Sequence, residues 1–371
     1  MKLNRFSMLA AALAAGSLAL TACGGSSNTS AGSGSSSTAK TCAKLSGSLS
    51  GAGSTAQQAA MAAWQAAFQV TNPGVTVNYD PVGSGGGRQQ FLAAGGNILF
   101  AGSDAALTDD ELTASKSRRA GGTDAIDLPV YISPIAVAYN LPGVSSLQLS
   151  PDTIAQIFSG KIKKWDDPAL KADNPGVKLP STAITPVHRA DDSGTTQNFT
   201  DYLSKAAGSS WTYPAAQTWP VKGGEAATGT SGVVQAITQG KGAVGYADAS
   251  QVGKLGVAKV KVGSTYVTES ADAAAKVAEL STPTPSRPAG DLSIDVARTT
   301  TEAGAYPVIL ISYQIVCQQY AKAGDGALVK AFETYVTSAE GQAAAAKAAG
   351  SVPLTDVLRT KVLASIAMIK G

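Results

Sequence analysis

Short β-rich runs alternate with amphipathic helical stretches along most of this 371-residue chain. That alternation is typical of α/β structures, in which helices and sheets pack in layers. In the first helical stretch, Met61, Trp64 and Phe68 share one face, which is the spacing of a buried stripe. Strands are predicted at 75–79, 97–102, 130–139, 184–188, 242–246 and 307–316. Helices are predicted at 57–68, 109–117, 150–158, 196–206, 231–239 and 327–337.

The beginning of the chain is predicted to direct export. Lys2 and Arg5 precede a short apolar run, and small residues follow it, so residues 1–22 are interpreted as a signal peptide. Leu-Thr-Ala before Cys23 resembles the lipobox of bacterial lipoproteins, in which that cysteine is acylated. The alternative is an ordinary cleavable signal with Cys23 a bystander. Residues 23–41, rich in Gly, Ser and Thr, are predicted to form a lipid-anchored flexible tether.

The composition indicates a packed body with little long-range charge. Hydrophobic residues make up 44% of the chain and charged residues 15%, so a core is expected and disorder is not. Without Lys2 and Arg5, 27 basic residues face 26 acidic ones. A nearly neutral chain lacks the field that attracts nucleic acid or an anionic bilayer. A bound anion would therefore have to be held by local groups.

Two cysteines remain after the leader, Cys42 and Cys317. In an oxidising compartment an isolated pair is more often a disulfide than a metal site, so a Cys42–Cys317 bridge is predicted. Two separate buried thiols are the alternative.

Two extended runs are predicted to cross between two lobes, at 128–132 and 305–310. If both are hinge strands, lobe I comprises 42–130 plus 306–371. Lobe II is then the middle of the chain, 131–305.

Three Gly/Ser/Thr clusters, 51–55, 83–87 and 191–196, precede predicted helices. The start of a helix presents unpaired N–H groups and the positive end of the helix dipole, which together suit an oxyanion. Taken singly, each cluster is more often just an N-cap. In the first cluster, Thr55 and Gln58 have the spacing of a capping box.

Two charged positions make the clusters more informative. Arg189 can present a fork of donors to a tetrahedral anion, and Asp191 could hold its guanidinium, although a surface ion pair is the alternative. Asp104 makes sense beside an anion that carries a proton, because a carboxylate only accepts hydrogen bonds. Phosphate near neutral pH carries such a proton and sulfate does not. The alternative is that Asp104 caps the helix predicted from Asp109.

These motifs resemble the phosphate-binding protein of the bacterial phosphate ABC transporter, over almost the whole body after residue 46. The resemblance implies two doubly wound lobes joined by two hinge strands, a type II periplasmic-binding-protein-like fold. It rests on Gly51-Ala52-Gly53-Ser54-Thr55, Gly83-Ser84-Gly85-Gly86-Gly87, Gly102-Ser103-Asp104-Ala105, 157–167, 188–196 and 242–246.

The resemblance also implies phosphate in the cleft between the lobes, and partners in the permease and ATPase subunits of an importer. Its ligands correspond to Thr55, Ala56 (through the backbone N–H), Ser84, Asp104, Arg189, Ser193, Gly194 and Thr195, with Asp191 supporting the arginine. This chain departs from the family pattern at Ala56 for Phe, Gly85 for Ser and Asp192 for Gly. Asp192 adds negative charge near the site, unless it points to solvent.

Other functions fit the sequence less well. A Ser-His-Asp triad would have to use His188, the only histidine, and no Gly-x-Ser-x-Gly, metal-binding or Walker motif occurs. The basic run Lys161, Lys163 and Lys164 with Trp165 invites a nucleic-acid interpretation, but a solvated helix end is the more common origin. Another oxyanion or a secondary adhesive role stays open. We expect a monomeric, lipid-anchored binder on the extracytoplasmic face of the cell membrane, without enzymatic activity, metal or cofactor.

Overall fold

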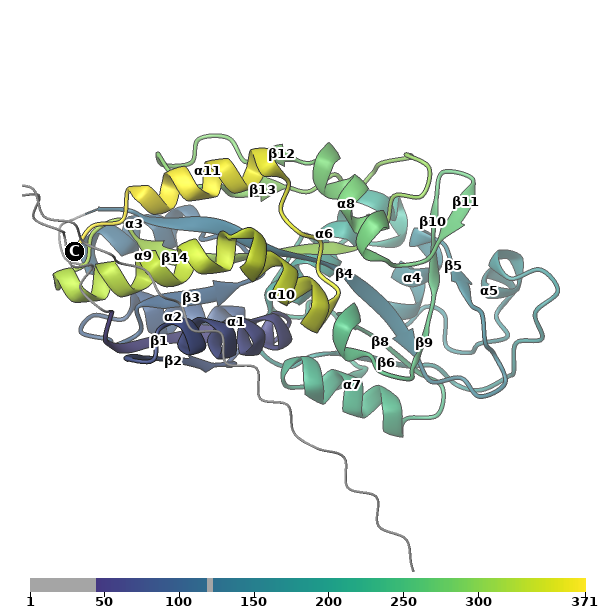
Figure 1. The fold of residues 1–371 in the computed structure, drawn as a ribbon. Coiled ribbons are helices and arrows are strands. Elements are labelled where there is room, and N and C mark those ends of the chain that lie inside the picture. The colour runs from purple at the N-terminus through teal and green to yellow at the C-terminus, as the bar shows by residue number, and fades with distance from the viewer. Residues whose placement is uncertain (1–44, 119–122) are drawn as a thin grey trace, which may run out of the picture. The chain divides into compact units, whose positions relative to one another are not determined.

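The computed structural model describes residues 45–118 and 123–371 (Figure 1). The predicted signal peptide, tether, Cys23 and Cys42 lie outside the described residues, so the anchor and the disulfide stay predictions. Cys317 is buried. Of the helices in the described ranges, none has the length and apolar character to cross a membrane.

Within the described residues, nine strands form one mixed sheet with the order β2-β1-β3-β14-β4-β8-β6-β7, and β9 pairs with β4. The first half of the sheet is β1 (Gly47–Gly53), β2 (Val75–Asp80), β3 (Phe100–Ser103) and β14 (Ile309–Cys317). The second half is β6 (Thr185–Arg189), β7 (Glu225–Ala227), β8 (Ala243–Asp248) and β9 (Gly256–Val257). Parallel pairing joins β1 to β2 and β3, and joins β6 to β7 and β8.

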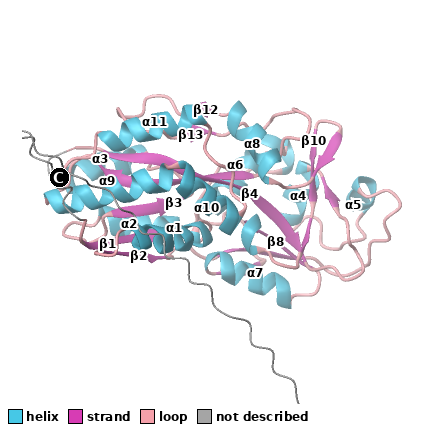
Figure 2. Cartoon of the chain, viewed as in Figure 1, coloured by secondary structure: helices cyan, strands magenta, loops and turns pink. Residues whose placement is uncertain are grey.

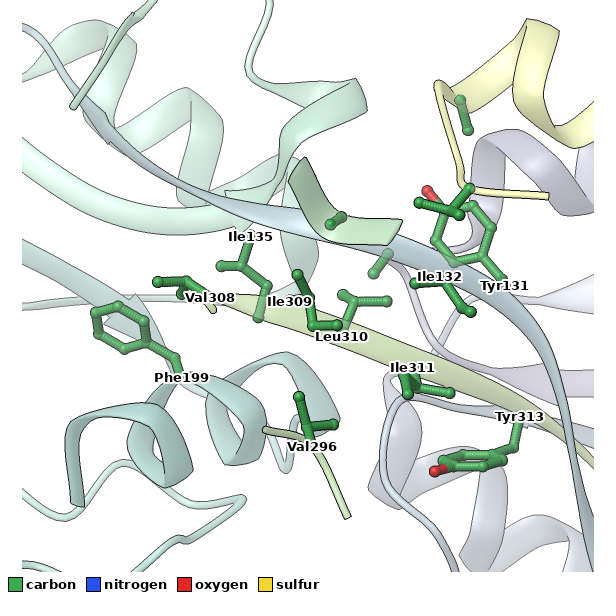
Figure 3. Close-up of a cluster of buried hydrophobic side chains, with 14 of the residues drawn as sticks. Tyr131, Ile132, Ile135, Phe199, Val296, Val308, Ile309, Leu310, Ile311 and Tyr313 are labelled. Atoms are coloured by element: carbon green, nitrogen blue, oxygen red, sulfur yellow. The ribbon is translucent and has the colours of Figure 1, made fainter. Parts of the chain in front are cut away.

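The long strand β4 (Ala125–Tyr139) joins the two halves. Its residues 125–134 pair antiparallel with β14, and its residues 135–139 pair antiparallel with β8. Every residue of β4 and β14 is buried, and Figure 3 shows apolar side chains of both strands, including Ile132, Ile135 and Leu310, gathered where they run together. Because β4 is hydrogen-bonded to both halves, it fixes the line along which they meet.

Helices cover the sheet in both halves (Figures 1 and 2). Beside the first half lie α1 (Gln58–Thr71), α2 (Ser84–Leu92), α3 (Asp109–Arg118), α9 (Ala323–Thr337), α10 (Ala339–Ala349) and α11 (Asp356–Ala367). The remaining helices are α4 (Pro151–Phe158), α5 (Pro168–Asp173), α6 (Gly194–Ala206), α7 (Gly229–Gln239) and α8 (Ala271–Leu280). Short strands complete the structure: β5 (Gln148–Leu149), β10 (Lys259–Val262), β11 (Thr265–Val267), β12 (Thr282–Pro283) and β13 (Ile294–Asp295).

The predicted α/β fold is confirmed, and the six predicted strands and six predicted helices all occur with shifted ends. The predicted stripe of Met61, Trp64 and Phe68 is buried in α1. One expectation needs correction: the second glycine cluster does not precede its helix but forms the first turns of α2. A Cβ on Gly87 would lie 2.4 Å from the Cα of Gly53, so a glycine there lets α2 pack directly on β1.

The predicted capping box at Thr55 and Gln58 is wrong. The side chain that serves the start of α1 is Ser54, whose Oγ accepts the N–H of Ala56 at 3.0 Å. The hydroxyl of Thr55 is directed elsewhere, to Thr230.

The lobe boundaries stay a prediction. The segment around Arg287 and Leu292, which that prediction assigns to lobe II, is hydrogen-bonded to residues assigned to lobe I. Arg287, assigned to lobe II, donates to the carbonyl oxygen of Leu107 (2.8 Å) and to Asp127 (2.6 Å), both assigned to lobe I. Leu292 donates its N–H to the carbonyl oxygen of Asp127 at 3.0 Å. This part of the middle segment is therefore fastened to the first half of the sheet.

Candidate functional site

Four helix starts in the described part of the chain converge where the halves of the sheet meet. The helices α1, α2, α6 and α7 begin just after the carboxyl ends of β1, β2, β6 and β7. Within each half, the carboxyl ends of the parallel strands share one edge, and in open α/β sheets ligands bind at such an edge. Hydrogen bonds of Thr55 with Thr230 and of Thr195 with Asp104 bring the edges of the two halves together. Each start brings N–H groups and the positive end of a helix dipole to the same region.

Asp104 lies at the centre of this region and is only 3% exposed. One carboxylate oxygen, Oδ1, accepts hydrogen bonds from the hydroxyls of Ser54 (2.6 Å) and Ser312 (2.7 Å). The other, Oδ2, accepts from the hydroxyl of Thr195 at 3.0 Å. The backbone N–H of Asp104 donates to Ser84 Oγ at 3.1 Å. Groups from α2, β14, α6 and the loop after β1 therefore meet at Asp104.

The alternative interpretation of Asp104, as the cap of α3, is wrong, because Thr108 caps that helix. At the start of α3, Thr108 Oγ1 accepts the N–H of Glu111 (3.2 Å), and Thr108 donates its own N–H to the Glu111 carboxylate (2.9 Å). Asp104 is thus engaged in the site and not in the helix.

Arg189 is buried and its partner Asp191 is half-buried, so they are not a surface ion pair. The guanidinium donates through Nε to Asp191 Oδ1 (2.7 Å) and through Nη2 to Oδ2, and Arg189 is 3% exposed. Partial burial raises the pKa of the Asp191 carboxyl, but the hydrogen bonds and charge of Arg189 and the N–H of Gly229 outweigh it, so this pKa lies below its usual value. The Tyr246 hydroxyl accepts the backbone N–H of Arg189 at 3.2 Å, which orients the arginine further.

Thr55 connects the two halves directly. Its hydroxyl lies 2.9 Å from the hydroxyl of Thr230 and accepts the Thr230 N–H at 3.1 Å. Gln251 Nε2 donates to the carbonyl oxygens of Thr55 (2.9 Å) and Ala56 (3.0 Å). The Ala56 N–H donates to Ser54 Oγ in this arrangement.

Ser193 and Gly194 place the start of α6 against the Asp104 loop. Ser193 Oγ accepts the N–H of Thr196 at 3.1 Å, so Ser193 is the N-cap of α6, as the simpler interpretation of this cluster had it. Asp104 and Ala105 lie so close to Gly194 that a Cβ there would be 2.8 Å from their atoms. The start of α6 and the Asp104 loop are therefore in direct contact.

The structure brings all eight predicted ligand positions and Asp191 into this region, and it adds three residues that the sequence interpretation missed. Thr230 follows Gly229 at the start of α7, a fourth Gly/Thr helix start that the same rule could have found. Ser54 belongs to the first cluster but was not singled out. Ser312 lies inside β14, where no local signal marks it, because only the pairing of β14 with β3 and β4 brings it to Asp104.

The negative charge of Asp192 lies at the surface. Its side chain is exposed and accepts a hydrogen bond from the hydroxyl of Thr218 at 2.6 Å. Its carbonyl oxygen accepts the N–H of Gly85 at 3.1 Å and so joins α2 to the loop before α6.

The chemistry of the site is hydrogen bonding. No group of three or more His, Cys, Asp and Glu residues suited to a metal ion occurs in the described ranges. His188 stacks on Trp219 with 5.2 Å between ring centroids, and its Nδ1 lies 2.9 Å from the carbonyl oxygen of Arg189. The site can surround a small anion with N–H, hydroxyl and guanidinium donors beside one carboxylate.

Sequence comparison identifies the class to which this fold and site belong. A family model for the PBP superfamily domain matches residues 31–340, which defines the chain as a substrate-binding protein of that superfamily. Phosphate-binding protein PstS3 of Mycobacterium bovis is 36% identical over 375 residues and covers 99% of each chain. Phosphate-binding protein PstS 3 of Mycobacterium leprae is 37% identical over 341 residues, 90% of each chain.

Solved structures share the fold at lower identity. PfluDING, a high affinity periplasmic phosphate-binding protein bound with phosphate, gives a TM-score of 0.69 at 24% identity and covers 86% of this chain and 93% of that one. A putative phosphate ABC transporter substrate-binding protein from Clostridium perfringens gives 0.60 at 18% identity, with 83% and 100% covered.

From the sequence relatives, the chain belongs to the phosphate-binding protein family of the bacterial phosphate ABC transporter. That family is a class of transport proteins and not of enzymes.

Proposed function

We propose that this chain captures inorganic phosphate between the two halves of its sheet and delivers it to an ABC importer. The observation that carries the proposal is the meeting of helix starts from both halves at one place, where Thr55 bonds Thr230 and Thr195 bonds the buried carboxylate of Asp104. Arg189, held by Asp191, lies just before the loop that leads to Thr195. The names of the PstS relatives support the same ligand.

The bonding of Asp104 supports selection of a protonated anion. A carboxylate offers about four lone-pair positions. Three are used by Ser54, Ser312 and Thr195, two of them on Oδ1 and one on Oδ2. One acceptor position on Oδ2 is left for the O–H of a hydrogen phosphate. Sulfate brings only another acceptor to this point, and an unmatched buried pair of acceptors costs several kcal/mol.

The remaining oxygens of the anion would meet donors from both halves. In the first half these are Thr55, the N–H of Ala56, and Ser84. In the second half they are the guanidinium of Arg189 and the start of α6. The full proposed ligand set is Thr55, Ala56, Ser84, Asp104, Arg189, Ser193, Gly194 and Thr195, with Asp191 orienting Arg189 and with Thr230 added from the geometry at α7.

Calorimetric titration with phosphate, sulfate and arsenate tests the proposal. The wild-type chain should bind phosphate and arsenate and show no measurable sulfate binding. In Asp104→Asn the preference for phosphate over sulfate should fall by about a thousandfold, because an amide can donate to sulfate. Asp272→Asn, at an exposed position on α8, is the matched control. Equal wild-type affinities for sulfate and phosphate would show that the assigned role of Asp104 is wrong.

We also propose that the chain acts without catalysing a reaction, because its family is a class of transport proteins and the imidazole of His188 stacks on Trp219. A chromogenic phosphoester provides the check: turnover by the wild type that disappears in Arg189→Ala would overturn the proposal that the chain is a transport protein.

The anchoring proposals concern the start of the chain. We propose that Cys23 is acylated, that the protein is held on the extracytoplasmic face of the membrane as a monomer, and that Cys42 and Cys317 form a disulfide. Detergent partitioning of the expressed chain and of Cys23→Ala tests the anchor. The mass gained on alkylation, with and without prior reduction, tests the disulfide.

A further inference from the structure

Arg88 is a buried cation in α2 that none of the proposed phosphate contacts uses. It is 4% exposed, and its guanidinium has three partners. Nε donates to Glu111 at 2.9 Å, Nη1 donates to Ser103 Oγ at 2.9 Å, and Nη2 donates to Gln217 Oε1. Glu111 and Ser103 belong to the first half of the structure, whereas Gln217 lies in the segment after α6 in the second half.

On the side of the first half, Arg88 fixes the loop that carries Asp104. Ser103 Oγ accepts from Arg88 and donates to the carbonyl oxygen of Ala105 at 2.6 Å. The residue between Ser103 and Ala105 is Asp104, so this pair of hydrogen bonds clamps the backbone on both sides of the carboxylate. The ion pair with Glu111 balances the positive charge of Arg88. Arg88 therefore does not require a bound anion to neutralise its charge.

On the side of the second half, Gln217 is firmly attached to the start of α6. Its carbonyl oxygen accepts the N–H of Ser193 at 3.1 Å. The next residue, Thr218, donates to Asp192, and the preceding one, Ala216, donates its N–H to Thr200 at 2.9 Å. A bond to the Gln217 side chain is therefore a bond to the α6 start that carries Ser193, Gly194 and Thr195.

We propose that Arg88 is a positioning residue, which holds the phosphate cleft closed by linking the Asp104 loop to the start of α6 through Gln217. This inference rests on the proposed phosphate binding and deepens it. The bonds to Ser103 and Glu111 lie within one half and persist when the halves separate. The bond to Gln217 exists only while they are together. This hydrogen bond therefore stabilises the closed complex and slows the dissociation of phosphate.

Gln217→Ala is the most direct test, because it removes the acceptor and leaves Arg88 with Glu111 and Ser103. Loss of one hydrogen bond to a charged group is expected to weaken phosphate binding by about 10- to 100-fold. Since the bond forms on closure, the change should appear in the dissociation rate, with the association rate nearly unchanged. Trp219 provides the signal for stopped-flow fluorescence, because its ring lies 5.7 Å from that of Tyr246, which contacts Arg189.

A double-mutant cycle separates this role from general stabilisation. Arg88→Lys keeps the charge but lacks the fork that spans Ser103 and Gln217, so it should also speed dissociation. Arg88→Lys combined with Gln217→Ala should lose little more than either change alone. Urea unfolding of Gln217→Ala without phosphate should match that of the wild type. Arg359→Lys, at an exposed ion pair on α11, is the control and should change neither rate.

The possible results are distinct. A wild-type chain that does not bind phosphate contradicts the proposed function itself. A wild type that binds, together with a Gln217→Ala variant of unchanged dissociation rate, overturns the role of Arg88 alone. So does a loss of affinity that lies wholly in the association rate.

Discussion

Gly85 and Asp192 are expected to be sterically coupled. The space between them has room for a side chain at one of the two positions but not at both. The N–H of Gly85 donates to the carbonyl oxygen of Asp192 across the meeting of the two halves. A Cβ on Gly85 would lie 2.4 Å from the Cβ of Asp192 and 3.2 Å from its carbonyl oxygen. The family pattern that this sequence resembles has Ser and Gly at these positions, the reverse arrangement.

The change Gly85→Ser should therefore oppose closure of the site. Forcing extra atoms into a close contact costs about 1–3 kcal/mol, and loss of the hydrogen bond costs about 0.5–1.5 kcal/mol. Together these correspond to phosphate binding weaker by about 10- to 2000-fold, at 1.36 kcal/mol for each factor of ten. Adding Asp192→Gly removes the opposing Cβ and should restore most of the affinity.

Calorimetric titration of phosphate into the single and double variants measures both effects. Gly324→Ser is the matched control, since a Cβ on Gly324 would meet no atom within 4 Å. If Gly85→Ser binds phosphate as the wild type does, the two positions are not sterically coupled. If it binds weakly and Asp192→Gly fails to restore affinity, the loss has another origin than the contact of the two Cβ atoms.

Three further predictions concern single side chains. Burial raises the pKa of Glu333 to about 8, and neither carboxylate oxygen has a hydrogen-bond partner among the described residues. The folded state thus favours the protonated acid, so the free energy of unfolding should fall as pH rises from about 4.5 through 8, by at most about 5 kcal/mol. Glu333→Gln should make this fall smaller in urea unfolding at pH 5 and 9, and a variant with the same fall as the wild type contradicts the assignment. Thr230→Val removes the hydroxyl that meets Thr55 and should weaken phosphate binding by about two- to tenfold in titration; unchanged binding would exclude Thr230 from the site. Tyr246→Phe leaves the N–H of Arg189 without its acceptor and should lower the free energy of unfolding by about 1–3 kcal/mol, whereas no loss would mean that this N–H finds another partner.

Much of the fold was accessible from the sequence because its signals are local. Apolar periodicity within α1 and β-rich runs such as β8 do not depend on distant residues. The strand β1 was missed for the opposite reason. Its sequence, Gly-Ser-Leu-Ser-Gly-Ala-Gly, has the composition of a loop, and it becomes a strand because β2 and β3 pair with it on both sides.

The same distinction separates the parts of the site. Arg189, Asp191 and Ser193 lie within a few residues of one another, so their motif was visible in the sequence. Ser312 is separated from Asp104 by 208 positions, and its hydroxyl could be assigned only after the position of β14 in the sheet was known. Arg88 escaped notice because its role depends on Gln217 from the other half.

The charges at the site support the proposal that selectivity depends on a proton of the bound anion. Arg189 is the cation of the proposed ligand set, and it is already paired with Asp191, while Asp104 adds a second carboxylate. These three groups together attract no anion by net charge. The attraction must come from the helix starts, whose N–H groups and dipoles act only at short range. Because those donors suit any tetrahedral anion equally, the proposed function assigns the distinction to Asp104, which would accept a hydrogen bond from an O–H that sulfate does not carry.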